Sequence, residues 1–157
     1  MEKVQRLFQE AKNYLSTADH LTYVTYNLLK DQKLVLPILQ NLYNACLNVI
    51  AALIYYEKIY KKVNPFPLDA DSRIKLFETE LAKKYKLDNQ NIKVIKELRT
   101  IINDHMKSSL EFARGDKLVI CNEDYSKLDI IDSSKLKYYI LNTKKLLGDV
   151  ERCLNKM

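Results

Sequence analysis

The chain contains very few of the two residues that interrupt regular backbone structure. Only two Gly and three Pro occur among its 157 residues. Sandwiches, barrels and collagen-like repeats need many tight turns or a periodic glycine, and this sequence provides neither. Gly-rich phosphate loops are excluded as well, because neither Gly-x-Gly-x-x-Gly nor Gly-x-x-x-x-Gly-Lys-Ser/Thr occurs. The scarcity of helix breakers therefore predicts a helical protein.

Size and composition predict one globular domain over residues 1–157. A chain of this length can bury a core without disulfide or metal support. Hydrophobic residues make up 47% of the chain and charged residues 29%, which is far from the composition of a disordered protein. The net charge of +6 favours anionic partners without requiring one.

Apolar residues recur at steps of three and four along most of the chain, which is typical of amphipathic helices. We expect one long helix over roughly residues 2–29, with Leu28 and Leu29 at the end of its buried stripe. A central helix from Leu34 to Tyr60 is followed by two shorter helices, the second of which buries Met106. A last helix runs from Leu136 to Leu154. The expected N-caps of the four later helices are Asp31, Asp69 or Asp71, Asp88, and Asp132 with Ser133 and Ser134.

Residues 112–132 depart from the helical pattern. Arg114-Gly115-Asp116 has the composition of a turn, and Lys117–Cys121 is a strand-like run. Leu128–Ile131 could pair with that run as a hairpin, or the whole segment could be a loop over one end of the bundle. In either case Phe112 could plug the bundle end and Glu111 could pair with Arg114. The predicted fold class is all-α, an antiparallel bundle of four to five helices with a short β-hairpin or loop insertion before the last helix.

Cysteine usage and hydropathy predict a cytoplasmic location. Cys46, Cys121 and Cys153 are odd in number and widely spaced, so we expect reduced thiols and neither a disulfide framework nor a metal site. The chain begins directly in an amphipathic pattern without the apolar run of a signal peptide. Its longest apolar stretch, Val49–Tyr56, is too short to span a bilayer. We expect no membrane partner, no metal and no other cofactor.

Two histidines, His20 and His105, are available for acid–base chemistry near neutral pH. Nothing around His20 suggests a catalytic group, so we expect an ordinary polar role there. His105 lies near the end of the fourth predicted helix, beside the irregular segment. An Arg followed after five residues by His, here Arg99 and His105, late in a helix of a basic all-α bundle, resembles the R-x(4–6)-H motif of the HEPN superfamily.

The resemblance implies a function in RNA metabolism. In active HEPN members the Arg and the His are implicated in metal-independent RNA cleavage, usually in a dimer that brings two motifs together. By this resemblance, Arg99 would stabilise phosphate charge and His105 would transfer a proton. Thr100 follows Arg99 where many active members carry Asn, Asp or His, so polar assistance would come from Asn103 or Asp104.

The segment Ser108–Lys117 carries a second likeness. A Ser-rich helix end that leads into Glu-Phe-x-Arg and a short strand-like run is similar to uncharacterised prokaryotic HEPN-like proteins. This likeness extends the resemblance over roughly residues 1–150. It implies the same bundle architecture and no particular activity.

Lysine clusters add candidate phosphate contacts. Lys58, Lys61 and Lys62 close the second predicted helix close to several tyrosines, a combination that suits RNA binding and base stacking. If the helices alternate in direction, this cluster meets His105 at one pole of the bundle. Cations at the end of a helix also complement its dipole, which is a purely structural explanation. Arg114 is the fourth residue that we expect to bind RNA.

Two functions of different classes follow. The first is an RNA-associated protein, either a metal-independent endoribonuclease or a degenerate RNA-binding relative, for which we expect a homodimer or a helical protein partner. The alternative is a non-catalytic helical module for protein interaction or dimerisation. The sequence leaves the RNA or protein target, the oligomeric state and the presence of catalysis open.

Overall fold

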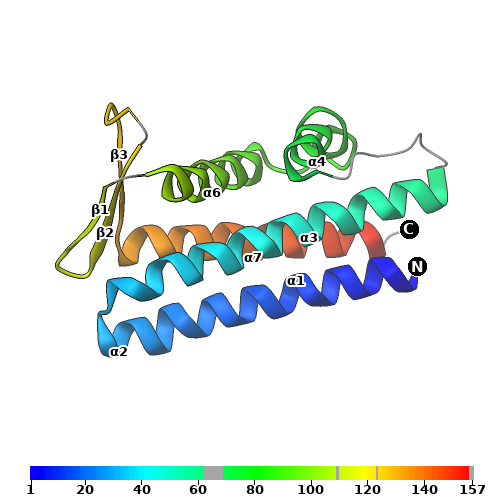
Figure 1. The fold of residues 1–157 in the computed structure, drawn as a ribbon. Helices are drawn as coiled ribbons and strands as arrows, with labels where there is room; N and C mark the ends of the chain where they lie inside the picture. The colour runs from blue at the N-terminus through cyan, green and yellow to red at the C-terminus, as the bar shows by residue number, and fades with distance from the viewer. Residues whose placement is uncertain (62–68, 109, 123, 156–157) are drawn as a thin grey trace.

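A computed structural model describes residues 1–61, 69–108, 110–122 and 124–155 of the chain. Most of these residues are helical, and a small antiparallel sheet precedes the last helix (Figure 1). The prediction of a helical bundle with a β insertion is therefore confirmed, whereas the all-α class is too narrow. The helical elements are α1 (Glu2–His20), η1 (Leu21–Tyr26), α2 (Asn27–Leu29), η2 (Gln32–Leu34), α3 (Val35–Lys61), α4 (Ala70–Leu76), η3 (Phe77–Leu81), α5 (Ala82–Lys84), α6 (Asn89–Lys107) and α7 (Ser133–Asn155).

Aspartate side chains mark the starts of the later helical segments, as the sequence predicts. The carboxylate of Asp31 accepts a hydrogen bond from the Lys33 amide at the start of η2. Asp69, rather than Asp71, caps α4. Asp88 caps α6 and Asp132 accepts from the Lys135 amide at the start of α7. Each carboxylate satisfies an amide that has no partner within its own helix.

The bundle is built around α3. Its residues Leu42, Val49 and Leu53 are fully buried, and it contacts α1, α4, α6 and α7. In Figure 1, α1, α3 and α7 lie side by side, while α4 and α6 form a second layer and the sheet closes one end. The two termini lie together at the other end (Figure 1). Because neighbouring elements cover α3 from several sides, its wide apolar surface is removed from water.

By length and composition, the helix Gln32–Ile59 could also cross a membrane, since its apolar window has a mean hydropathy of 1.4. The uninterrupted apolar run Val49–Tyr56 is therefore shorter than the apolar part of this helix. In the structure 56% of that window is buried inside the protein. Burial in the bundle explains the apolar composition, and the expected lack of a membrane partner stays a prediction.

A π-helical segment changes which residues of the first helix are buried. The predicted helix over residues 2–29 forms as one continuous rod, but η1 interrupts its regular winding. An additional residue in one turn rotates all later side chains by about 100°. Tyr26 is consequently fully buried, whereas Leu28 and Leu29 are 78% and 65% exposed. The prediction that these two leucines belong to the core is wrong, and Met106, which is 77% exposed, is a second such error.

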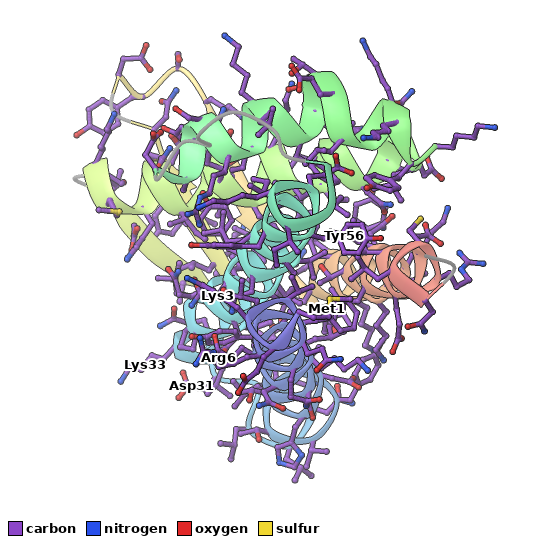
Figure 2. The ribbon with its side chains drawn as sticks, turned by 90° about the vertical axis from the view of Figure 1, so that its right-hand side faces the viewer. Met1, Lys3, Arg6, Asp31, Lys33 and Tyr56 are labelled. Atoms are coloured by element: carbon purple, nitrogen blue, oxygen red, sulfur yellow. The ribbon has the colours of Figure 1, made fainter. Side chains whose placement is uncertain are left out.

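The predicted meeting of the lysine cluster with His105 is also wrong. The segment α4–α5 does not run the length of the bundle, so α6 runs antiparallel to α3 and ends at the sheet (Figure 1). His105 and the C-terminal end of α3 therefore lie at opposite ends. Figure 2 looks onto the end that holds the N-terminus, where Lys3 of α1 donates a hydrogen bond to the Tyr55 hydroxyl of α3. The prediction that the start of the first helix lies beside the end of the central helix is therefore confirmed.

The sheet has three strands in the order β1-β2-β3, namely β1 (Glu111–Arg114), β2 (Lys117–Cys121) and β3 (Leu128–Ile131). Of the two alternatives that the sequence leaves open for this segment, the structure forms the hairpin, in which β2 pairs with β3 and Val119 lies opposite Ile130. The additional strand β1 pairs with β2 through a two-residue turn at Gly115. Gly115 adopts a φ of +65°, which a residue with a side chain adopts only with strain. Strand structure therefore begins at Glu111, earlier than the sequence predicts.

One tyrosine joins the tip of this hairpin to the bundle. The buried Tyr26 hydroxyl donates a 2.5 Å hydrogen bond to the backbone carbonyl of Asp116, 90 residues later in the chain. Burial, and then the nearby carboxylates of Asp116 and Asp132, raise the pKa of Tyr26. The hydroxyl therefore stays protonated as a donor at neutral pH.

We predict that Tyr26→Phe lowers the stability of the fold by about 1 kcal/mol, because the ring still packs while one hydrogen bond is lost. Thermal unfolding followed by circular dichroism should show a melting temperature about 2–4 °C lower. The control is Tyr23→Phe on the same segment, where the side chain is 44% exposed. Equal melting temperatures for Tyr26→Phe and the parent would contradict the proposed attachment of the hairpin.

Candidate functional site at the junction of α6 and the sheet

The end of α6 packs against one face of the sheet. Residues that lie directly opposite each other on paired strands share a face. Glu111, Ile120 and Asp129 form one such row across the three strands, with Ile120 fully buried in the middle. Asp104 and His105 of α6 meet the two outer members of this row. The arrangement brings four polar or charged side chains of α6, β1 and β3 to one junction.

At the β1 edge of the junction, His105 is hydrogen-bonded through Nδ1 to Oε1 of Glu111. The His105 side chain is 40% exposed and that of Glu111 is 25% exposed. A carboxylate at Nδ1 fixes the orientation and tautomer of an imidazole, and it leaves Nε2 as the atom that exchanges protons with a ligand. The pair has the geometry of a general base or acid at a solvent-accessible edge.

At the β3 edge, Asp129 is nearly buried, with 6% of its surface exposed. Its Oδ1 lies 3.8 Å from the Lys127 ammonium, and its side chain faces the carboxyl group of Asp104. Burial raises the pKa of Asp129, and the neighbouring Asp104 side chain raises it further against the opposing effect of Lys127 and Lys135. A carboxylate held in this way costs stability at neutral pH, which is typical of a functional position.

A half-open pocket of about 340 Å³ lies beside Asp129, between α6, β3 and the start of α7. Tyr139 lines this pocket, and its hydroxyl is buried beside the Glu97 side chain. Burial, followed by the charge of the nearby Glu97, raises the pKa of Tyr139. Four lysines also line the pocket, namely Lys93, Lys96, Lys127 and Lys135.

Arg99 and His105 have separate partners within the chain. Arg99 Nη1 lies 3.4 Å from Oδ1 of Asp71 on α4, whereas His105 contacts β1. Six helical residues separate them by about 9 Å along the axis and 120° around it. Any joint action of these two side chains therefore needs a contribution from a second molecule.

The other predicted site residues are distributed over both ends of the molecule. Asn103 is exposed, and Asp104 faces Asp129 instead of assisting His105. Lys58 is exposed near the C-terminal end of α3, far from the junction. Lys61 ends the same helix, and Lys62 lies outside the described residues. Arg114 is exposed at the end of β1.

Sequence reasoning missed Glu111 and Asp129 as site residues. It placed Glu111 beside Arg114, but Glu111 pairs with His105. Phe112, expected to plug the bundle end, is 43% exposed on the opposite face of β1. An acidic residue inside the run Leu128-Asp129-Ile130-Ile131 was an available signal, because an inward charge between apolar strand residues needs an explanation.

Cys46, Cys121 and Cys153 are free, as their spacing predicts, and burial raises the pKa of the Cys46 thiol to about 12. In the part of the chain that the structure describes, no three His, Cys, Asp or Glu side chains gather as metal ligands. Comparison of the chain with protein-family models, with curated proteins and with solved structures gives no match. The HEPN resemblance stays a prediction.

We predict that Asp129→Asn stabilises the protein by about 1 kcal/mol at pH 7–8, because it removes a buried charge. The raised pKa means that ionisation disfavours the folded state. The increase in stability should be full at pH values above the pKa of Asp129 in the folded protein. It should disappear below a pH of about 4, where the carboxyl group is protonated in both the folded and the unfolded protein. Chemical denaturation at a series of pH values measures it.

Asp124→Asn is a control of opposite sign, because hydrogen bonds from Ser126 lower the pKa of Asp124. The Asp124→Asn variant should be less stable than the parent at neutral pH. This difference should vanish as the pH falls below the pKa of Asp124 in the folded protein. A destabilised Asp129→Asn variant at neutral pH would show that the Lys127 ion pair outweighs the burial of the carboxylate.

Proposed function

We propose that this protein acts on RNA at the junction of α6 and the sheet, as a HEPN-like metal-independent endoribonuclease. The observation that carries the proposal is the His105–Glu111 pair, a half-exposed imidazole whose orientation is held by a carboxylate. The net charge of +6 favours an anionic substrate. The resemblance to the R-x(4–6)-H motif of the HEPN superfamily adds the expectation that this substrate is RNA.

In the proposed reaction, Nε2 of His105 takes the proton of a ribose 2′-hydroxyl. The 2′-oxygen then forms a bond to the adjacent phosphorus while the bond from phosphorus to the 5′-oxygen breaks. The departing 5′-oxygen takes up a proton from solvent water, so that the products are a 2′,3′-cyclic phosphate and a 5′-hydroxyl, and the imidazolium of His105 then releases its proton to the solvent. Glu111 stabilises the imidazolium that forms during this transfer.

Phosphate charge in the transition state needs a cation, and Arg99 is the residue that the resemblance assigns to this role. Within one chain Arg99 points away from His105 and pairs with Asp71 of α4. We therefore propose that the active form is a dimer, in which a second copy completes the site. Exposed apolar side chains next to the pair, Met106, Leu110 and Phe112, support contact of this edge with another molecule.

We predict that His105→Ala reduces RNA cleavage in the presence of EDTA by about 10²- to 10⁴-fold. Glu111→Gln should reduce it by about 10- to 100-fold, because the imidazole loses the group that orients it. The measurement is the initial rate with a labelled single-stranded RNA, together with analysis of the product ends.

His20→Ala is the matched control, because His20 is exposed on α1 and should leave the rate unchanged. Removal of the half-exposed His105 ring should change stability by no more than about 0.5 kcal/mol. A large fall in melting temperature for His105→Ala, with no cleavage by the parent protein, would end the nuclease proposal.

A second candidate function is supported by another surface. Val24, Leu28 and Leu29 are exposed together near the end of the first helical rod. Such a group of apolar side chains suits a protein interface, so a non-catalytic dimerisation module is the alternative.

Salt dependence separates the two functions. We predict that RNA affinity falls steeply between 50 and 200 mM salt, because phosphate contacts release counterions. Fluorescence anisotropy with labelled RNA measures this, and Asp71→Asn should increase the affinity by freeing Arg99. Self-association that is unchanged over the same range, without RNA binding, would favour the interaction module.

A further inference from the structure

The first helical rod ends in two adjacent leucines that extend into solvent. Leu28 and Leu29, which we call the leucine tip, are 78% and 65% exposed. They follow the π-helical segment η1, whose additional residue turns Tyr26 into the core and these two side chains outward. Side chains exposed to this extent protrude from the surface, so the leucine tip is convex. Adjacent exposed apolar side chains of this size suit contact with another apolar phase.

Four cations lie at the same end of the molecule. Lys30 directly follows α2 and Lys33 belongs to η2, while Arg114 and Lys117 lie opposite each other beside the β1–β2 turn. Tyr26 connects the two groups, because its hydroxyl is hydrogen-bonded to that turn and the Lys30 ammonium lies 6.0 Å from its ring centroid. Figure 1 shows α2 and the hairpin of β1 and β2 at one end of the bundle.

These four cations are not neutralised within the described part of the chain. Their side chains are exposed, and among the described residues none of them has a carboxylate oxygen within 4.0 Å. Three aspartates lie at the same end. Asp116 and Asp132 are half-buried, and the carboxylate of the exposed Asp31 accepts a hydrogen bond from the Lys33 amide. The exposed charge around the leucine tip is therefore mainly positive.

We propose that this end of the molecule binds the surface of a membrane that contains anionic lipids. The leucine tip enters the headgroup layer, while Lys30, Lys33, Arg114 and Lys117 contact lipid phosphate and carboxylate groups. Apolar side chains beside exposed cations are the combination that an anionic bilayer surface accommodates. Attachment of this kind needs no spanning segment. The proposal thus replaces the expectation of no membrane partner, which rested on the lack of such a segment.

Other partners satisfy only one of the two features. A second copy packed on this end would bring the cations of both copies together, and their repulsion opposes such a contact. RNA would neutralise the cations but would leave the leucine tip in water. A lipid surface removes the leucines from water and neutralises the cations together. None of these residues contributes to the His105–Glu111 pair, so the proposal does not rest on RNA cleavage.

The first experiment uses an introduced fluorophore, because the chain contains no Trp. Leu28→Trp places the reporter on the leucine tip. Ile59→Trp is the control, since Ile59 is 46% exposed near the end of α3, at the opposite end of the molecule. With vesicles of phosphatidylcholine and phosphatidylserine, we expect the emission of Leu28→Trp to shift to shorter wavelength and that of Ile59→Trp to stay unchanged. Vesicles of phosphatidylcholine alone should give a much smaller shift.

The second experiment measures cosedimentation of the full chain with the same vesicles. The double variant Leu28→Ser with Leu29→Ser should bind at least tenfold more weakly at an unchanged melting temperature, because these side chains are exposed. Lys30→Gln and Arg114→Gln should each weaken binding about fivefold, which corresponds to the usual contribution of one cation near an anionic surface. Lys83→Gln, which removes an exposed cation from α5, should bind like the parent.

Three results would overturn the proposal. They are no binding to anionic vesicles up to about 1 mM lipid, equal binding to neutral and anionic vesicles, and equal binding by the parent and the double serine variant. If vesicles do not bind while the double serine variant loses self-association or RNA affinity, the leucine tip belongs to a protein or RNA interface instead. His105→Ala should bind vesicles like the parent, so failure of the cleavage proposal does not affect this test.

Discussion

Burial of α3 is the interaction on which the rest of the structure depends. Its residues between Ile38 and Leu53 include a nearly continuous set of fully buried apolar side chains. The helices α1, α4, α6 and α7 all contact this helix. Because the hydrophobic effect acts on area and has no direction, it drives these elements together without specifying their order or angles. The hydrogen bond of Tyr26 with Asp116 and the contacts of α6 with the sheet supply that specificity.

The polar junction lies where this apolar core ends. On the inner face of the sheet, Ile120 belongs to the core, while its two neighbours in the row are Glu111 and Asp129. The first carboxylate is hydrogen-bonded to His105, and the second faces the carboxyl group of Asp104. Their environments give them different chemistry, since one holds an exposed imidazole and the other is a buried acceptor. The proposed function assigns proton transfer to the first edge.

Half of the candidate site could be predicted from the sequence. His105 was identified because only two histidines exist and one of them lies at a helix end beside an irregular segment. Its partner Glu111 could not be assigned, because β1 is only four residues long and its pairing depends on the turn at Gly115. Arg99 was joined to His105 by spacing alone, and the structure gives it Asp71 as partner instead. Local spacing does not determine which surfaces the tertiary fold brings together.

The sequence by itself determined the helices, their aspartate caps and the lack of disulfide spacing, and it left a hairpin or a loop open for residues 117–131. These features depend on local periodicity, on side-chain hydrogen bonds to neighbouring amides and on turn residues, all of which operate within a few positions. Only the tertiary structure decided the π-helical turn that exposes Leu28 and Leu29, the direction of α6, and the pocket that holds Asp129 and Tyr139. Those features arise from contacts between residues far apart in the chain, whose free energies depend on packing that no local pattern encodes.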